Sequence, residues 1–239
     1  TSFDETSLRF LKQFNLPIHK VSSFENTDLR LIKLVAKTKK PMIISLGMAN
    51  YKEIKEAVHT AKKNGCKKLI LLKCTSAYPA KYEDANLATI PFLRKSFKCE
   101  VGLSDHTLGI STALAATAFG ASVIEKHFTL DRGLPGPDHS FAIEPLELKE
   151  MMCKLREVEV SLGDGSKNGP RFEEIEMAEK GRRSIHAKVN ISKGEIITED
   201  MLCVKRPGFG ISPFLKKIII GRKVKKDISV DEWITWEMI

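Results

Sequence analysis

Two histidines, His106 and His127, each follow an apolar stretch of the chain. Neutral imidazole is a good ligand for divalent ions such as Mn²⁺, Co²⁺ and Zn²⁺. The two residues are 21 positions apart, one strand-plus-helix step of an alternating α/β chain, so we expect them on neighbouring strand ends. If they share one ion, their nearest nitrogens must lie within about 8 Å of each other. Two protein ligands leave positions for water and a substrate oxygen. The alternative is a histidine pair that only shapes the mouth of a site.

A second group of side chains has the chemistry to bind an anion. Lys20 can supply a charge-assisted hydrogen bond, and hydroxyl donors lie at or just after the ends of four of the expected strands. These are Ser23, Ser45, Ser76 and Ser104. A single serine at a strand end commonly caps the next helix. Four of them together with a lysine favour an oxyanion site.

The elements that must position these groups alternate over residues 1–160. Expected strands are Ile18–Ser22, Pro41–Leu46, Lys68–Cys74, Cys99–Leu103 and Ser122–Phe128. Expected helices are Glu5–Phe14, Asp28–Thr38, Tyr51–Asn64, Ala85–Phe97, Gly109–Phe119 and Leu146–Leu162. Strands that are apolar almost throughout indicate burial on both faces, hence a parallel sheet. The pattern fits a doubly wound sheet or part of a barrel. Polar residues at every strand end favour the barrel, because all its strands end at one mouth.

A different pattern follows the turn-rich segment Gly163–Pro170. Short β-like pieces are expected at Ser184–Val189, Glu195–Ile197, Leu202–Lys205 and Lys217–Val224. We therefore expect a barrel-type domain over residues 1–163, a linker over 164–182 and a small, mostly β domain over 183–239. A domain of that size holds little core, so docking or oligomer contacts are expected.

Composition narrows the class of protein. The formal charge is +9, but the basic residues are mixed with 30 acids and aromatics make up only 7%, which favours an anionic small substrate over nucleic acid. No apolar run approaches the ~20 residues of a membrane span, and the first residues do not resemble a signal peptide. Five cysteines at irregular spacing predict neither a zinc ribbon nor a disulfide framework, so we expect a cytoplasmic protein.

Several strand-end motifs resemble those of the sialic acid synthases. They are Gly102–Thr107, Ile124–Thr129, Gly136–Asp138, Lys20–Glu25 and Ile43–Ala49, and in the tail Val204–Gly208. The resemblance implies an α/β fold, a TIM-type (β/α)₈ barrel followed by an antifreeze-protein-like (SAF) domain. It begins near the end of the third strand, so we expect an incomplete barrel of about strands 3/4 to 8. The family's first two strands carry a catalytic Glu, a Lys and a Gln. Without them, we expect the chain alone to be poorly stable and inactive.

The same resemblance implies a reaction and roles for individual residues. Phosphoenolpyruvate condenses with an N-acetylated amino sugar to a nine-carbon acid, with a divalent metal (Mn, Mg or Co) at His106 and His127. Phosphate or carboxylate binding is implied for Thr1, Lys20, Ser23, Ser45, Ser76 and Ser104. Sugar binding is implied for Glu25, Tyr78 and Asp138, and Arg206 is implied to enter the partner's site in a domain-swapped homodimer. Taken singly, these four residues also suit a solvated glutamate, a core-edge tyrosine, a turn aspartate and a surface arginine.

The segment Leu71–Ala80 together with Glu83–Asn86 is most like pseudaminic acid synthase, whose acceptor is a 2,4-diacetamido-2,4,6-trideoxy-altrose. Lys73 and Ser76 stand where the neuraminate and legionaminate branches usually have His and Asn. Those branches, with an N-acetylmannosamine-type acceptor, are the alternative. Ketodeoxyoctonate-phosphate and deoxyheptulosonate-phosphate synthases lack the tail motif. An inactive, carbohydrate-binding scaffold derived from a synthase is the alternative of another class.

Overall fold

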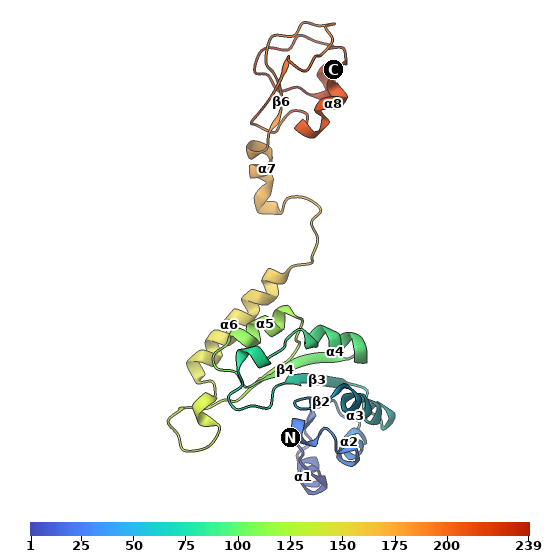
Figure 1. Cartoon of the computed structure of the whole chain (residues 1–239), viewed down its shortest axis with the longest axis vertical. Helices are drawn as coiled ribbons and strands as arrows, with labels where there is room; N and C mark the ends of the chain where they lie inside the picture. The colour runs from blue at the N-terminus through green and yellow to red at the C-terminus, as the bar shows by residue number, and fades with distance from the viewer. The chain divides into compact units, whose positions relative to one another are not determined.

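The computed structural model describes all 239 residues, Thr1–Ile239. The chain divides into two compact units, Thr1–Asp164 and Gly165–Ile239 (Figure 1). The first contains a five-stranded parallel sheet and the second a two-stranded antiparallel sheet. None of the helices combines the length and apolar character needed to cross a bilayer.

The sheet of the first unit follows the order of the chain. Its strands are β1 (His19–Val21), β2 (Met42–Ser45), β3 (Leu69–Cys74), β4 (Glu100–Asp105) and β5 (Ile124–Lys126). Each strand pairs in parallel with the next, in the order β1-β2-β3-β4-β5. A doubly wound sheet would reverse this order at a switch point, whereas a barrel does not. The expected incomplete barrel is therefore confirmed, as a half-barrel of five strands.

Helices connect the strands as expected. They are α1 (Glu5–Leu11), α2 (Leu29–Ala36), α3 (Tyr51–Lys63), α4 (Thr89–Phe97), α5 (Ser111–Ala118) and α6 (Pro145–Leu162). Short 3₁₀ helices lie at Lys12–Phe14, Ser23–Glu25, Tyr82–Asp84, His139–Phe141, Phe172–Glu174, Pro213–Leu215 and Trp236–Met238. Local capping fixes several starts: the Asp28 carboxylate accepts from Leu31 N at 3.0 Å, and Asn50 forms a capping box with Glu53.

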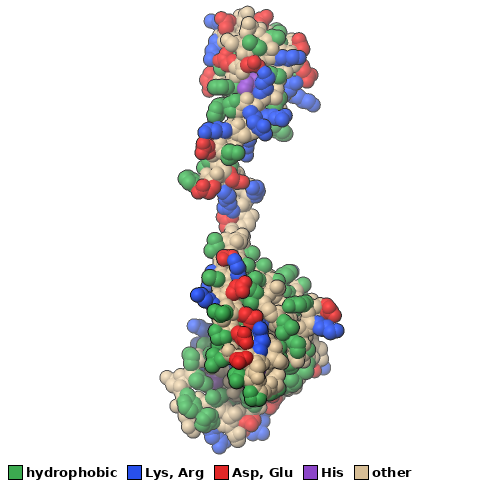
Figure 2. All heavy atoms as spheres, turned by 90° about the vertical axis from the view of Figure 1, so that its left-hand side faces the viewer, with side chains coloured by type: hydrophobic (Ala, Val, Ile, Leu, Met, Phe, Trp, Pro, Cys, Tyr) green, Lys and Arg blue, Asp and Glu red, His purple; other side chains and the backbone are tan.

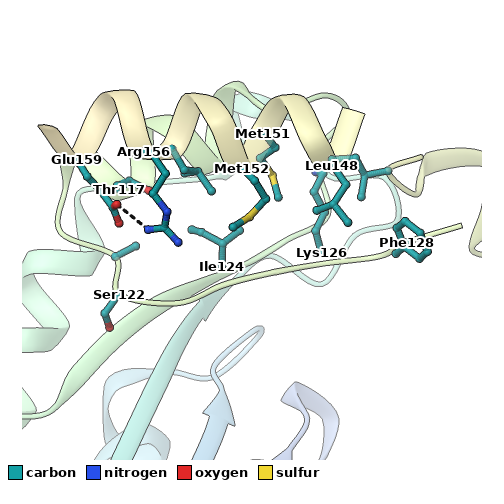
Figure 3. Close-up of a pocket in the computed structure, with 13 residues that line it drawn as sticks. Thr117, Ser122, Ile124, Lys126, Phe128, Leu148, Met151, Met152, Arg156 and Glu159 are labelled. Atoms are coloured by element: carbon teal, nitrogen blue, oxygen red, sulfur yellow. Dashed lines mark hydrogen bonds and ion pairs between the residues drawn. The ribbon is translucent and has the colours of Figure 1, made fainter. Parts of the chain in front are cut away.

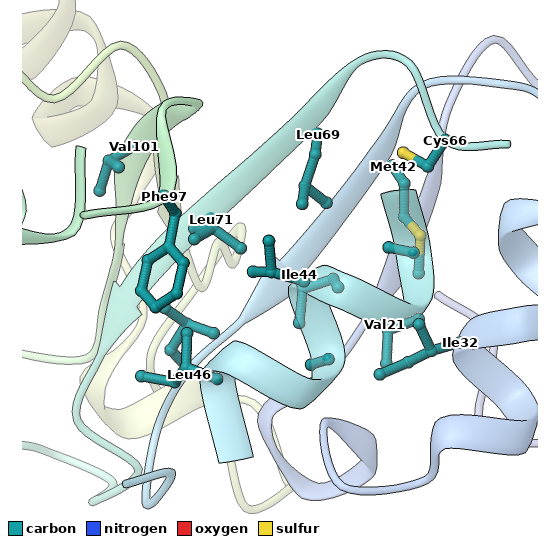
Figure 4. Packing of buried hydrophobic residues seen from close by; sticks show 14 of the residues in the cluster. Val21, Ile32, Met42, Ile44, Leu46, Cys66, Leu69, Leu71, Phe97 and Val101 are labelled. Atoms are coloured by element: carbon teal, nitrogen blue, oxygen red, sulfur yellow. The ribbon is translucent and has the colours of Figure 1, made fainter. Parts of the chain in front are cut away.

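The core of the first unit lies between the sheet and its helices (Figure 4). Alternate strand residues such as Val21, Ile44 and Leu71 are completely buried. They pack with helix residues of the same cluster, including Ile32 and Phe97. The other face of each strand carries the residues that reach the strand ends, so one strand both fills the core and presents the site.

Charged side chains of both signs lie over α6 on the face of the first unit seen in Figure 2. Lys154 pairs with Glu157 at 2.8 Å, and Arg156 pairs with Glu159 at 2.6 Å. Such pairs at one helical turn stabilise an exposed helix face modestly. This face carries mixed charge rather than a basic patch.

The second unit contains α7 (Ile175–Gly181), β6 (Ser184–Ala187), β7 (Leu202–Lys205) and α8 (Lys216–Ile219). Its core is rich in isoleucine: Ile185, Ile191, Ile197, Ile219, Ile228 and Ile234 are all nearly or fully buried. Residues 164–182, expected as a linker, include α7.

The β-like expectation for Lys217–Val224 is wrong at its start, because residues 216–219 form α8. Pro213 lies in the first turn of a 3₁₀ helix that runs directly into α8, and proline suits such a start. Ile196 and Lys223 form only an isolated antiparallel bridge.

Candidate active site

The carboxyl ends of all five strands border one cavity of about 230 Å³, called the site cavity below. Its lining is Thr1, Phe3, Lys20, Ser22, Ser23, Phe24, Ser45, Cys74, Tyr78, Ser104, His106, Glu125 and His127. Of the predicted site residues, the cavity brings together Thr1, Lys20, Ser23, Ser45, Tyr78, Ser104, His106 and His127. The cavity mixes acceptors, donors and aromatic rings, as expected of a site for a small polar ligand.

The two histidines face each other across neighbouring strands. Their ring centroids are 5.1 Å apart with an interplanar angle of 67°. This separation places the nitrogens within the limit of about 8 Å for sharing one ion. The ring of Tyr78 lies 4.3 Å from His106 and 5.8 Å from His127, so it covers both imidazoles.

His106 is oriented by a backbone carbonyl. Its Nδ1 is 2.8 Å from Thr75 O, and because a carbonyl oxygen only accepts, Nδ1 carries the proton and Nε2 keeps its lone pair. Burial lowers the pKa of His106, but the contacts with Cys74 Sγ and the Thr75 carbonyl outweigh it, and the pKa is raised overall. Burial raises the pKa of Cys74, but the His106 contact at 3.9 Å and neighbouring hydroxyls lower it to about 7.

His127 has a carboxylate partner. Its Nδ1 is 3.5 Å from Asp138 Oδ2, and its ring centroid is 5.0 Å from that of Phe141. Burial lowers the pKa of His127 although Asp138 opposes the shift, so the neutral imidazole is favoured. The contact with Asp138 through Nδ1 leaves Nε2 available as a ligand atom.

The donor set fits a divalent ion that keeps several exchangeable ligands. No group of three or more His, Cys, Asp and Glu side chains is arranged to hold a metal. An ion at His106 and His127 would therefore have two imidazoles and otherwise water or substrate oxygens. Mn²⁺ and Co²⁺ accept such mixed nitrogen and oxygen surroundings.

Glu125 contacts both Lys20 and Ser104, two of the residues expected to bind an anion. Its Oε1 lies 2.9 Å from Lys20 Nζ and accepts from Ser104 Oγ at 2.8 Å. Sequence reasoning assigned Glu125 no role. The signal was its position two residues before His127, because alternate residues of a strand share a face.

The hydroxyl groups of Ser23 and Ser76 lie around Gly47, and the Ser45 hydroxyl is a further one in the cavity lining. Gly47 N donates to Ser23 Oγ at 3.0 Å, which leaves the Ser23 proton available for another acceptor. Ser45 Oγ is buried and has no hydrogen-bond partner. A Cβ on Gly47 would collide with Ser76 Oγ and lie 2.9 Å from Ser23 Oγ, so this glycine lets the hydroxyls converge. A buried hydroxyl without a protein partner in a cavity is suited to bonding with a ligand.

Four predicted residues are not in the cavity lining. Ser76 lies beside it, with Oγ 3.7 Å from Cys74 Sγ, and Asp138 reaches it through His127. Glu25 accepts a short hydrogen bond from Ser22 Oγ. Arg206 belongs to the second unit, where its Nε donates to Gly181 O at 2.7 Å.

A separate groove lies between α6 and β5 (Figure 3). Leu148, Met152 and Arg156 of α6 point toward the segment that carries Ile124. Lys126 also lines it, but its ammonium is tied to Asp105 Oδ2 at 2.8 Å. That buried pair fixes the β4 exit, since Asp105 Oδ1 also accepts from Thr107 N at 2.9 Å. The groove is mainly apolar and lacks a comparable set of catalytic side chains.

Comparison with known families matches these two units to two models. The NeuB family model matches residues 1–167, and the SAF domain model matches residues 182–239. The chain belongs to the NeuB family.

Named relatives of this NeuB chain include synthases of N,N'-diacetyllegionaminic, pseudaminic and N-acetylneuraminic acid. An N,N'-diacetyllegionaminic acid synthase of Campylobacter jejuni is 43% identical over 236 residues, covering 98% of this chain and 70% of that protein. A pseudaminic acid synthase of Campylobacter jejuni is 41% identical over 229 residues, covering 95% and 65%. The crystal structure of N-acetylneuraminic acid (sialic acid) synthetase from Leptospira borgpetersenii is 37% identical, with a TM-score of 0.69 over 74% of this chain and 61% of that one. The chain thus spans about two thirds of the length of these relatives.

Proposed function

We propose that this chain carries the metal- and phosphoenolpyruvate-binding part of a synthase that joins phosphoenolpyruvate to an N-acetylated amino sugar. Its NeuB relatives are synthases of this carbon–carbon bond-forming type. The observation that carries the proposal is a single cavity in which the His106–His127 pair lies near the Lys20, Ser23, Ser45 and Ser104 donors.

One group of side chains binds phosphoenolpyruvate and another binds the sugar. Lys20, Ser23, Ser45 and Ser104, with Thr1 and Ser76 at the margin, bind the phosphate and carboxylate of phosphoenolpyruvate. Tyr78 packs against the sugar, and Asp138 and Glu25 accept hydrogen bonds from its hydroxyl or amide groups. A divalent cation held by His106 and His127 would polarise the sugar aldehyde oxygen.

The proposed reaction uses this arrangement. C3 of phosphoenolpyruvate forms a bond to the aldehyde carbon, and the aldehyde oxygen gains a proton to become a hydroxyl. Water adds to C2 and gives up the proton that the aldehyde oxygen gains. The bond between C2 and the bridging oxygen then breaks, inorganic phosphate leaves with that oxygen, and the hydroxyl left on C2 loses its proton to the phosphate to become the keto group. Oriented donors around the developing charges supply electrostatic stabilisation without reorganisation.

For the acceptor we propose a 2,4-diacetamido-2,4,6-trideoxy sugar, with the altro form of the pseudaminate branch as first choice. Identities of 43% to a diacetyllegionaminic acid synthase and 41% to a pseudaminic acid synthase support this class but do not choose between its epimers. An N-acetylmannosamine-type acceptor is the remaining candidate. Mass and stereochemical analysis of the product from each sugar would decide.

We also propose the arrangement around this site. Residues 1–163 form the synthase unit, 164–182 the connection and 183–239 the SAF unit. In a domain-swapped homodimer, Arg206 would donate from its guanidinium to the acetamido oxygen bound by the other subunit. Phosphoenolpyruvate is an intracellular metabolite, so we place the reaction in the cytoplasm.

Metal titration tests the proposal at its centre. Mn²⁺ binding to the chain, followed by the electron paramagnetic resonance signal of free Mn²⁺, should weaken about 100-fold in His106→Ala and in His127→Ala. His59→Ala is the matched control, because His59 is exposed on α3, and it should leave binding unchanged. Equal Mn²⁺ affinity in all four proteins would favour the inactive scaffold instead.

A labelled substrate tests the chemistry in an active assembly. Phosphoenolpyruvate carrying ¹⁸O in the bridging position should give ¹⁸O in the released phosphate, because the C–O bond breaks. Label retained in the sugar acid would contradict the proposed reaction.

A further inference from the structure

Lys73 is the one charged residue of strand β3. It lies on β3, is half-buried, and borders a cavity of about 380 Å³ whose walls include Leu46, Tyr51 and Phe92. Burial lowers the pKa of Lys73, although Cys74 and Asp84 oppose the shift. Burying an unpaired charge costs free energy unless its donors find other acceptors.

The ammonium finds those acceptors at the end of its own strand. Lys73 Nζ donates to Cys74 O at 3.0 Å and to Thr75 Oγ1 at 2.8 Å. Thr75 Oγ1 donates in turn to Asp84 O at 2.9 Å. Lys73 therefore ties the β3 exit to the turn that follows it, and Thr75 is held by its side chain from two directions.

The carbonyl group of the same threonine orients His106. Thr75 O accepts from His106 Nδ1 at 2.8 Å, a closer contact than that of Cys74 Sγ at 3.9 Å with the same nitrogen, so it orients the ring and favours the tautomer with Nδ1 protonated. The direction of that carbonyl depends on the backbone angles of Thr75, and the Lys73 and Asp84 contacts restrict those angles. The contacts of Thr75 with Lys73 and Asp84 both lie outside the site cavity.

We propose that Lys73 is a positioning residue that acts through Thr75 to keep His106 in the tautomer with Nδ1 protonated and Nε2 facing the site cavity. The consequence for metal binding rests on the proposed function, but the orientation of the ring does not. A methionine at position 73 would fill a similar volume without any donor. An arginine would keep the charge and several donors.

The ¹⁵N chemical shifts of His106 give the direct test. In the metal-free chain at about pH 8.5, above the usual histidine pKa of about 6.5, the wild type should show one protonated and one unprotonated ring nitrogen. Lys73→Met should move the two shifts toward each other, as a mixture of tautomers does, and Lys73→Arg should restore them. Lys68→Met is the matched control, because Lys68 is exposed just before the same strand.

Metal affinity is the second readout. Lys73→Met should weaken Mn²⁺ binding about tenfold, and Lys73→Arg should recover most of it, because partners of a ligand's second nitrogen commonly contribute 10–100-fold. Unchanged His106 shifts in a folded Lys73→Met protein would overturn the inference even if Mn²⁺ binds as proposed. Conversely, if the wild type binds no Mn²⁺ but Lys73→Met still changes the His106 shifts, the proposed function alone is overturned.

A second variant covers the case in which Lys73→Met does not fold. Thr75→Val removes the hydroxyl that Lys73 and Asp84 hold, and leaves the carbonyl group in the chain. It should mix the His106 tautomers in the same direction. A folded Thr75→Val protein with wild-type shifts contradicts the inference.

Discussion

Ser45 lines the site cavity and is only 2% exposed. Its buried hydroxyl has no hydrogen-bond partner. Leaving such a group unsatisfied costs about 1–3 kcal/mol in a folded protein. The neighbouring Ser23 hydroxyl, in contrast, is held by Gly47 N. The Ser23 hydroxyl therefore contributes a hydrogen bond to the folded protein, whereas the Ser45 hydroxyl contributes none.

We expect Ser45→Ala to separate stability from ligand binding. The melting temperature should stay equal or rise, because the substitution removes an unsatisfied polar atom and breaks no contact. Phosphoenolpyruvate affinity should fall about tenfold, the equivalent of one hydrogen bond to a charged group of about 1.5 kcal/mol. Thermal unfolding and calorimetric titration measure the two effects.

Ser111→Ala serves as the control, since Ser111 begins α5 outside the site cavity. A Ser45→Ala protein that is clearly less stable, yet binds phosphoenolpyruvate as before, would show that the hydroxyl supports the fold instead.

The sequence identifies candidate site residues by their distinctive side chains, but not residues that join the site only through contacts with neighbouring strands. His106, His127, Lys20 and the strand-end serines could be named because imidazole, ammonium and hydroxyl groups follow apolar runs. Glu125 has no such signature: its contacts with Lys20 and Ser104 arise from sheet register, which places Ser104 opposite Glu125. Cys74 is not among the predicted site residues either, and it lines the cavity because the alternation of β3 turns it toward His106.

At the scale of elements, the start of α6 organises the loop that carries Asp138. Arg132 donates from its backbone N to Glu144 Oε1 at 2.9 Å and pairs closely with Glu147. Glu144 N donates to Glu147 Oε2 at 3.1 Å, which completes a capping box. These contacts tie the chain after β5 to the first turn of the helix.

We expect Glu147→Gln to destabilise the chain in a pH-dependent way. The Arg132 hydrogen bond and the Glu144 backbone N–H lower the pKa of Glu147 below its unfolded value. Its contribution is therefore present above about pH 4.3, the usual Glu value, and is lost as the pH falls through the lower, folded pKa. At neutral pH the loss should be about 0.5–1 kcal/mol, because solvent screens this half-exposed pair.

Urea unfolding of Glu147→Gln and wild type at pH 7 and at about pH 3 measures the difference. Glu150→Gln, exposed on the same helix, is the matched control. A stability gap that stays constant down to the acid end would mean that the side-chain shape, and not its charge, matters.

Element types were easier to predict than element limits. Four strands of the sheet lie within the predicted runs, and β4 overlaps its run and extends two residues beyond it to Asp105. The predicted helix from Ala85 begins only at Thr89, since a 3₁₀ turn occupies Tyr82–Asp84 and Asn86 has a φ of 40°. In the tail, residues 217–219 are predicted to be β-like from their composition but form part of α8, because the 3₁₀ helix that begins at Pro213 runs directly into it.

At the scale of the whole molecule, the two units have separate hydrophobic cores. The core of the second unit draws all its residues from Ile185 to Ile239. Its two strands and isolated bridges lie within residues 184–239, and the loop at Arg206–Gly208 also bonds to Glu179 and Gly181 of α7. Domains of about 60 residues often fold alone, although they are marginal.

We therefore expect the fragment 182–239 to fold without the first unit. It should give dispersed amide signals in NMR and one cooperative thermal transition. Ile234→Ala, at a site with no accessible surface, should destabilise the fragment and the whole chain alike by about 2–4 kcal/mol. Mn²⁺ binding by the whole chain should be unaffected.

Exposed Ile218→Ala is the control for the fragment, since that side chain lies 53% accessible. A fragment with collapsed signals, or Ile234→Ala effects seen only in the whole chain, would show that the second unit depends on the first.

The pairing of Lys20 with Glu125 also bears on how the cavity chooses among negative ions. The ammonium is already neutralised by a tethered carboxylate, whose effective concentration far exceeds that of a dissolved rival. Chloride or free inorganic phosphate gains little by displacing it. A molecule that bears two anionic groups and also reaches the orphaned Ser45 hydroxyl gains several contacts at once. We therefore expect the Glu125 carboxylate to disfavour the binding of abundant single anions in the cavity relative to that of phosphoenolpyruvate.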